Sequence, residues 1–191
     1  MSRTKLLILF GGNSSEYKVS LQSAYAVVKA LNPEKYDTIL LGITWHGEWL
    51  KYDGPPDKIC KDTWWYDHSC IPAIISPARN MSGIVVFEGK QATHFAVDVA
   101  FPILHGKNGE DGTVQGLLEL AGIPYVGCGI LSSAVCMDKD IAHRLVEAAG
   151  IPIPPSIVLS PHVSEMEILD LIKTLRSPLF VKPAKGGSSI G

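Results

Sequence analysis

Hydrophobic and polar positions alternate in blocks along this chain, and the blocks predict strands and helices in turn. Lys5–Phe10 and Thr38–Ile43 are largely apolar runs, as expected of strands that are buried on both faces. Between them, Val19–Leu31 carries apolar residues at helical spacing and stops at Asn32-Pro33. Further elements are expected as strands at Ala73–Ser76, Gly83–Phe87 and Val97–Phe101, and as a helix at Gly112–Ala121. This alternation predicts an α/β fold with a mostly parallel sheet.

Residues 53–72 interrupt the alternation with prolines, tryptophans and two cysteines, and we expect them to form a surface excursion. Later in the chain, Asp138 can cap a helix that runs through Ala149. Ser164 and Glu167 have the spacing of a capping box, which predicts a second helix start.

Two more segments of the C-terminal third have the composition of strands, Ser156–Ser160 and Leu179–Lys182. The chain then stops in a Gly/Ser-rich loop directly after the second of them, at the point where a helix usually follows a strand. We therefore expect the chain to be incomplete.

Composition narrows the classes of protein that fit this pattern. The 191 residues are 46% hydrophobic and 19% charged, which is enough to build a core and too little charge for a disordered chain. A formal net charge of −2 gives no electrostatic footprint for a nucleic-acid partner. No apolar run approaches the ~18–20 residues that span a bilayer, so we expect no membrane partner and a cytoplasmic location. The cysteines lack metal-site and redox spacings and are expected to be reduced thiols: Cys60, Cys70, Cys128 and Cys136.

The first segment that can carry chemistry is Leu9–Ser20, where a strand runs into Gly11-Gly12 and then into a helix. This arrangement resembles nucleotide-binding geometry, in which helix N-terminal amides hold an anion. The G-x-G-x-x-G fingerprint is absent, however, so dinucleotide binding has little support. Glu16 lies near the helix start, where an acidic side chain can also serve only the helix dipole.

The second segment, His105–Gly116, reads HGKNGEDGTVQG and follows a predicted strand. Open α/β sheets bind ligands outside the carboxyl ends of such strands. One histidine, two adjacent acids and several glycines within a dozen residues exceed what a turn requires, so this segment is a strong candidate site.

Two lysines complete the candidates. Lys139 lies in the first turn of a predicted helix, where a cation must reach solvent or meet an anion. Lys182 interrupts a segment predicted to be a buried strand and precedes the Gly/Ser-rich loop. Backbone amides and hydroxyls of such a loop can cover phosphates while a lysine supplies the charge.

Taken in order, these segments resemble the D-alanine–D-alanine ligase family of ATP-grasp enzymes. The most specific match is HGKNGEDGTVQG, and GGNSSEYKVS, MDK and KPAKGGSSIG support it in the right order. The resemblance implies an ATP-dependent ligation of D-alanine to a second D-amino acid through an acylphosphate, for peptidoglycan precursors. It also implies a domain at 1–127 that binds substrate, the first part of an ATP-grasp central domain at 128–191, and a homodimer.

The resemblance assigns roles to four residues around the first D-alanine. Glu16 corresponds to the carboxylate that holds the substrate ammonium, and His105 to the histidine near the substrate carboxylate. Glu110 corresponds to the acid of the same loop. Ser188 matches a serine that hydrogen-bonds at the Glu16 position.

For ATP, the resemblance implies that Lys139 and Lys182 contact the phosphates and that Ser189 lies in the loop that covers them. The Mg²⁺ ligands of the family lie beyond residue 191, so the sequence predicts no metal ligand here. We accordingly expect this chain alone to lack ligase activity.

A finer resemblance concerns the second substrate. The pair Glu16-Tyr17, the run Asp62–Trp64 and the run Cys136–Lys139 look more like the D-alanine–D-serine ligases of vancomycin resistance. The residues that select the second substrate lie mainly downstream, so D-alanine, D-serine and D-lactate all stay open. Other ATP-grasp or NAD-type enzymes and a non-catalytic α/β binding fragment are the alternative functions.

Overall fold

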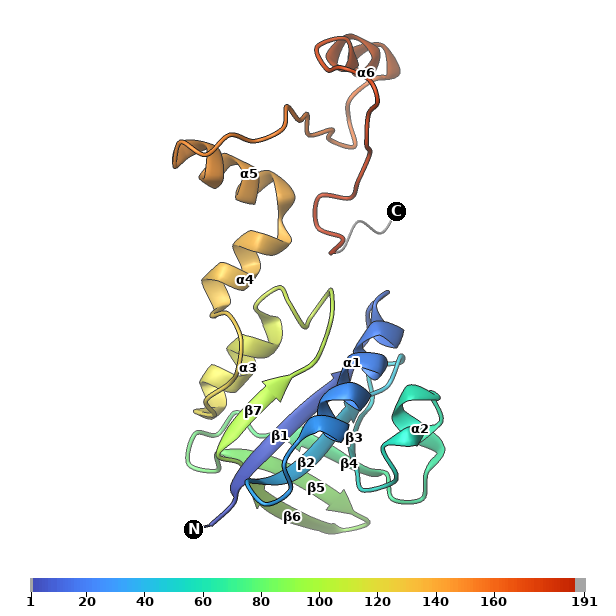
Figure 1. Ribbon diagram of the computed structural model, residues 1–191, viewed down its shortest axis with the longest axis vertical. Helices are drawn as coiled ribbons and strands as arrows, with labels where there is room; N and C mark the ends of the chain where they lie inside the picture. The colour runs from blue at the N-terminus through green and yellow to red at the C-terminus, as the bar shows by residue number, and fades with distance from the viewer. Residues whose placement is uncertain (1, 188–191) are drawn as a thin grey trace. The chain divides into compact units, whose positions relative to one another are not determined.

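A seven-stranded sheet forms the centre of the N-terminal part of the protein (Figure 1). The computed structural model describes residues 2–187. The strands are β1 (Thr4–Gly11), β2 (Tyr36–Ile43), β3 (Trp49–Tyr52), β4 (Ile71–Ile75), β5 (Gly83–Glu88), β6 (Gln91–Ala96) and β7 (Val99–Pro102). Their order across the sheet is β6-β5-β4-β3-β2-β1-β7.

The α/β class is confirmed, and the pairing of the strands divides the sheet into two halves. β1 pairs in parallel with both β2 and β7. From β2 outward to β6, each neighbouring pair is antiparallel. The expected parallel arrangement therefore surrounds β1, where the candidate site lies, and the other half of the sheet is an antiparallel meander whose strands need only short connections.

The helices are α1 (Tyr17–Ala30), α2 (Asp57–Cys60), α3 (Thr113–Ala121), α4 (Ile130–Met137), α5 (Lys139–Ala148) and α6 (Glu165–Ile172), with one 3₁₀ turn, η1 (Trp64–Tyr66). No helix among the described residues is both long and apolar enough to cross a membrane.

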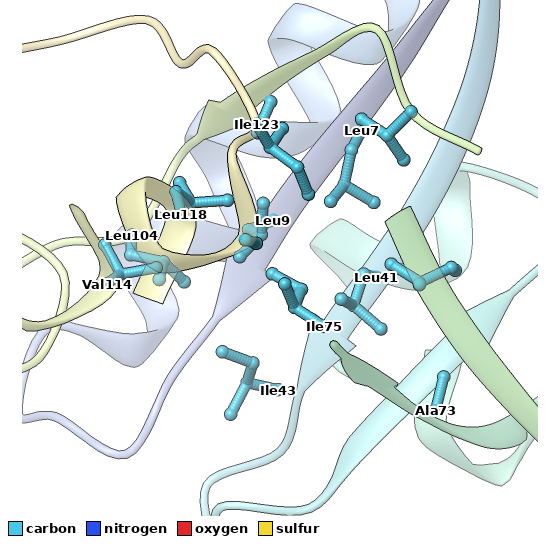
Figure 2. Packing of buried hydrophobic residues seen from close by; sticks show 14 of the residues in the cluster. Leu7, Leu9, Leu41, Ile43, Ala73, Ile75, Leu104, Val114, Leu118 and Ile123 are labelled. Carbon is cyan, nitrogen blue, oxygen red and sulfur yellow. The ribbon is translucent and has the colours of Figure 1, made fainter. Parts of the chain in front are cut away.

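β1 is buried on both faces, as its apolar run predicts, and successive side chains enter different clusters. Leu7 and Leu9 pack with Val114, Leu118 and other residues on the side of α3 (Figure 2). Their neighbours Leu6, Ile8 and Phe10 pack on the opposite face in a cluster with residues of α1, α2 and η1. The sheet is thus covered by helices on both faces, and β1 is its most buried strand.

The excursion at 53–72 contributes more to the core than its composition predicts. Ile59 of α2 and Trp64 of η1 are fully buried and belong to the same cluster as Phe10. The segment therefore packs onto the sheet through two apolar side chains and is not a surface excursion.

Contacts along the chain separate two compact units, Met1–Ala134 and Val135–Gly191, which we call the first and the second unit. The division falls within α4, which the sequence analysis did not predict. The assignment of 1–127 to a substrate domain and of 128–191 to part of a central domain stays a prediction.

In the second unit, the predicted helix starts are confirmed. The Asp138 carboxylate accepts hydrogen bonds from the backbone N–H groups of Asp140 and Ile141, and α5 follows. Ser164 and Glu167 form the predicted capping box at the start of α6. Both helices begin where short-range hydrogen bonds satisfy the free N–H groups of the first turn.

The strands predicted at Ser156–Ser160 and Leu179–Lys182 are wrong, since neither segment forms a strand in the described part of the chain. Phe180 and Val181, which were expected to be buried, are more than four-fifths exposed, and Lys182 is exposed as well. A strand exists only where a neighbouring strand completes its hydrogen bonds, and among residues 135–187 no such neighbour is present.

Candidate functional site

The candidate site of the first unit forms where β1 and β7 end side by side. β1 ends at Gly11, and the chain turns through Gly12 into α1, whose N-cap is Glu16. β7 leads through Ile103 and Leu104 to His105 and the loop that follows. Because the two strands are parallel, their carboxyl ends bring both loops to one edge of the sheet.

Hydrogen bonds from serine hydroxyls join these two loops. Ser14 Oγ donates to the His105 carbonyl oxygen at 2.7 Å, and Ser20 Oγ donates to the Ile103 carbonyl oxygen. Ser20 is fully buried and also accepts a hydrogen bond from the Gly11 N–H at 2.8 Å. The relative position of the two loops is therefore fixed by side chains of α1 and of the turn before it.

Glu16 lies in the interior of this junction. The residue is 6% exposed, and its Oε2 has no hydrogen-bond partner among the described residues. Oε2 lies 2.5 Å from the position that a Cβ atom on Gly106 would take, so any side chain there would displace the carboxylate. A buried carboxylate oxygen without a donor costs free energy, and that cost is recovered when a cationic ligand binds to it.

His105 has a polar side chain beside each ring nitrogen, within hydrogen-bond distance at Nε2 and farther away at Nδ1. Its Nε2 lies 3.1 Å from Ser23 Oγ, and its Nδ1 lies 3.7 Å from Glu110 Oε1. The imidazole is about one-third exposed, so a ligand can reach it. Glu110 also accepts the Gly106 N–H at 2.8 Å through Oε2, which closes the loop at its first turn.

The second acid of the loop, Asp111, organises the start of α3. It accepts hydrogen bonds from the backbone N–H groups of Asn108 at 2.8 Å and Thr113 at 3.0 Å. Although burial opposes ionisation, these bonds hold the pKa of Asp111 below its usual value. The carboxylate therefore stays charged and stabilises the turn that places His105 and Glu110.

A hollow of about 360 Å³ opens beside these loops. Its lining combines backbone of the β1 turn, apolar side chains of β2, β3 and α3, and polar side chains that include Asn13, His105, Lys107 and Asn108. The hollow is large enough for a small molecule, and the polar side chains in its lining suit one that carries charge.

The structure brings two of the sequence-predicted residues, Glu16 and His105, to one sheet edge, and it adds Glu110 through its contact with the imidazole. Ser188 and Ser189 lie outside the described residues, so their predicted roles stay predictions.

Ser23 was missed by the sequence analysis. It lies seven residues, or about two helical turns, after Glu16, which places both on one face of α1. This spacing is readable from the sequence, but the approach of His105 to that face depends on the pairing of β1 with β7.

In the second unit, the start of α5 meets the segment that follows Lys182. The Lys139 backbone N–H donates to the Ala184 carbonyl oxygen at 3.0 Å. Its ammonium donates to the carbonyl oxygens of Pro183 at 3.2 Å and Gly187 at 2.9 Å. The two segments that carry the predicted lysines are thus joined within one unit.

Asp138 and Lys185 add charge at the same place, with 3.5 Å between Oδ2 and Nζ. The hydrogen bond from the Ile141 N–H is the main reason that the pKa of Asp138 lies below its usual value, and Lys185 adds to it. Among residues 2–187 no group of three or more acidic, histidine or cysteine side chains could hold a metal ion. The described residues do not form a Mg²⁺ site.

Comparisons with known proteins agree with this arrangement. Over residues 5–128 the chain matches the family described as "D-ala D-ala ligase N-terminus". A D-alanine–D-alanine ligase from Thermoanaerobacter sp. (strain X514) is 45% identical over 195 residues, which cover 100% of this chain and 53% of the relative. The vancomycin B-type resistance protein VanB from Enterococcus faecalis is 45% identical over 193 residues, which cover 100% of this chain and 52% of the relative.

Among solved structures, the VanG D-Ala:D-Ser ligase from Enterococcus faecalis superposes with a TM-score of 0.87 at 48% identity, over 98% of this chain and 54% of that one. The chain spans about half the length of the curated relatives that it matches. Because the family model matches residues 5–128, the chain belongs to the D-Ala–D-Ala ligase N-terminus family.

Proposed function

We propose that this chain is the N-terminal part of an ATP-dependent ligase that joins D-alanine to a second D-amino acid for peptidoglycan precursors. The observation that carries the proposal is the buried Glu16 carboxylate, whose Oε2 has no donor among the described residues. The ammonium group of an amino acid supplies the charge and the N–H donors that this oxygen lacks.

The neighbouring residues fit the other end of such a substrate. His105 is partly exposed and held by Ser23 and Glu110, so it is oriented toward a ligand before the ligand arrives. We assign to it the contact with the carboxylate of the first D-alanine. Glu110 then keeps the imidazole in place, and Ser188 is proposed to hydrogen-bond with Glu16.

Lys139 and Lys182 are proposed to hold the phosphates of ATP, with Ser189 in the loop above them. Lys139 fits this role because, among residues 2–187, its ammonium is bound by carbonyl oxygens of Pro183 and Gly187 and by no carboxylate, so its positive charge can meet an anion. ATP supplies the phosphoryl group that activates the D-alanine carboxylate. What these residues add is position and positive charge, which dominate phosphoryl transfer.

The second substrate is proposed to be D-alanine or D-serine. Tyr17 and the run Asp62–Trp64 support D-serine, as does the likeness to a structure described as a D-Ala:D-Ser ligase. We propose that this ATP-dependent ligase acts in the cytoplasm. A role in vancomycin resistance is proposed only if the enzyme takes D-serine or D-lactate as its second substrate. The homodimer stays a prediction.

The test is a ligase assay on the full-length product of the gene, with release of phosphate from ATP measured against D-alanine concentration. Glu16→Gln removes the charge, and the Michaelis constant for D-alanine should rise by about 10- to 150-fold, the equivalent of the 1.5–3 kcal/mol of a charged hydrogen bond. The constant for ATP should change little. Lys182→Ala should show the opposite bias.

Glu34→Gln is the matched control, because Glu34 is an exposed acid in the turn between α1 and β2 and its neutralisation should leave both constants unchanged. Equal effects of Glu16→Gln on both substrates would make Glu16 a structural residue. The 191-residue chain alone should release no phosphate, and release by it with ATP, Mg²⁺ and D-alanine would contradict the proposed division of the site.

A further inference from the structure

Tyr17 and the run Asp62–Trp64, to which the proposed function gives no contact with a substrate, meet in the structure. The Tyr17 hydroxyl donates a hydrogen bond to Asp62 Oδ1 at 2.7 Å, across 45 residues of sequence. The same hydroxyl accepts the Trp64 Nε1–H at 3.2 Å. Burial, and next the hydrogen bond with Asp62, raise the pKa of Tyr17, so the hydroxyl keeps its proton and acts as a donor.

Tyr17 and Trp64 are anchored deeply. Tyr17 is 3% exposed and Trp64 is fully buried. The Trp64 ring packs edge-on against Phe10 of β1, with 4.8 Å between ring centroids, and Tyr17 packs edge-on against Trp45 at 5.9 Å. The hydroxyl is thus fixed between the sheet and the segment that follows α2.

Asp62 occupies a backbone position that normally belongs to glycine. Its φ is +55°, and the N–H groups of Asp62 and Thr63 donate to the carbonyl oxygens of Ile59 and Lys58. This pair of bonds is the Schellman motif that ends many helices, and its left-handed residue is usually glycine.

Two other helices of this protein end in the same way and do use glycine. α3 ends at Gly122 with φ +68°, and α5 ends at Gly150 with φ +76°. In each, the glycine and the following isoleucine make the same two hydrogen bonds. The third such turn has an aspartate in this less favourable conformation, and its side chain makes a hydrogen bond that glycine could not make.

We propose that Asp62 is a positioning residue that acts through the Tyr17 hydroxyl to hold the start of α1, and with it the carboxylate of Glu16. Tyr17 is the first residue of α1 and directly follows Glu16. The Oε2 atom of Glu16 has no partner of its own among the described residues, so the backbone of the helix start sets where it lies. The inference rests on the proposed function, because the readout is the binding of D-alanine.

The test compares Asp62→Gly, Asp62→Asn and Tyr17→Phe in the full-length gene product. Asp62→Gly removes the acceptor of the buried Tyr17 hydroxyl, which lowers stability, and also relieves the backbone, which raises it, so the free energy of unfolding should change little. The Michaelis constant for D-alanine should nevertheless rise by about three- to tenfold, the range that one hydrogen bond carries, while the constant for ATP stays unchanged. If Asp62 served only the stability of the fold, its replacement would not raise the Michaelis constant for D-alanine alone while the free energy of unfolding stayed the same.

Asp62→Asn is the conservative variant, because asparagine keeps the acceptor oxygen and tolerates a left-handed φ. Its constant for D-alanine should lie within about twofold of the wild-type value, a shift smaller than the loss of one hydrogen bond. Tyr17→Phe should match Asp62→Gly, and the double variant should be no worse than either single one, since both remove the same bond.

The outcomes separate the two proposals. An active wild-type enzyme whose constant for D-alanine is unchanged in Asp62→Gly and Tyr17→Phe would overturn the positioning role alone. Additive effects in the double variant, or equal rises in both constants, would overturn it as well. A wild-type protein without D-alanine-dependent phosphate release would overturn the proposed function, and this inference with it.

Discussion

The first unit buries two clusters of hydrophobic side chains on the two faces of one sheet, whereas no residue of 135–187 is buried in the second unit. The helices differ in the same way. α1 has no side-chain hydrogen bond at its N-cap, but Leu21 and Ala24 are fully buried. α5 and α6 have side-chain caps and no buried residue.

This difference separates two sources of structure. Packing of an apolar face supplies most of the stability of a helix in a folded protein, and a cap adds about 1 kcal/mol. The first unit therefore has the stability of a domain, while the helices of the second unit depend on short-range hydrogen bonds. The candidate residues Glu16 and His105 lie on this stable framework, whereas Lys139 and Lys182, which are proposed to bind ATP, lie in the second unit.

The largest expected effect is a difference in amide hydrogen exchange. Amides of β1, β2 and β7 should exchange only through global unfolding, which typically costs about 5–15 kcal/mol. Amides of α5 and α6 should exchange through local opening that costs close to zero. Hydrogen exchange measured by NMR or mass spectrometry on the 191-residue chain checks this. Equal protection in both units would contradict the proposed difference in their stability.

A matched pair of leucines gives the next largest effect. Leu118 of α3 is fully buried, and Leu169 of α6 is 56% exposed. Leu118→Ala should lower the free energy of unfolding by about 2–5 kcal/mol, because it leaves a cavity in the core. Leu169→Ala should change it by less than about 0.5 kcal/mol. Denaturant unfolding followed by tryptophan fluorescence measures the effect of Leu118→Ala, since the four tryptophans lie in the first unit, and helix content by circular dichroism measures the effect of Leu169→Ala.

A smaller effect is expected at a cap. Ser164→Ala removes the side chain that accepts the Glu167 N–H and should destabilise α6 by about 1 kcal/mol. Helix content by circular dichroism should fall, while exchange in β1 stays unchanged because the cap is local. Ser160→Ala is the control, since Ser160 is exposed and lies outside the capping box. Loss of protection in the first unit would show that the two units fold together.

The same contrast explains what the sequence could predict of the fold. The apolar run at Lys5–Phe10 predicts β1 within a residue at each end, because burial on both faces leaves a signal in composition. The caps at Asp138 and Ser164 are local and are likewise readable. β6 was missed because nearly all its residues are exposed and carry no apolar pattern. The prediction of a strand at Leu179–Lys182 was wrong, because local composition does not show whether a neighbouring strand is present to pair with it.

The candidate site divides in the same way. Glu16 and His105 could be placed at one sheet edge because both follow strands that the pattern predicts. Their surroundings could not be predicted, since the Ser23–His105 and Tyr17–Asp62 contacts join residues 82 and 45 positions apart. Such contacts depend on strand order and on how the segment after α2 packs, and no local pattern encodes them.

The smallest effect we expect is a dependence on pH in the first unit. Asp67 is buried and accepts hydrogen bonds from Lys58 Nζ at 2.6 Å and from the Ser69 N–H at 2.9 Å. Lys58 first, and then Ser69, hold the pKa of Asp67 well below its usual range.

Because the folded-state pKa is depressed, the carboxylate stabilises the fold above its unfolded pKa of about 3.9, and this contribution is lost as the pH falls further. The free energy of unfolding should therefore decrease from about pH 5 downward in the wild type, most steeply below about pH 3.9, and less steeply in Asp67→Asn. The effect is limited by screening, since the Lys58 side chain is 45% exposed, so added salt should reduce it. The free energy of unfolding is measured by urea titration at each pH. If it falls equally steeply with pH in the wild type and in Asp67→Asn, the fold does not favour the ionised form of Asp67.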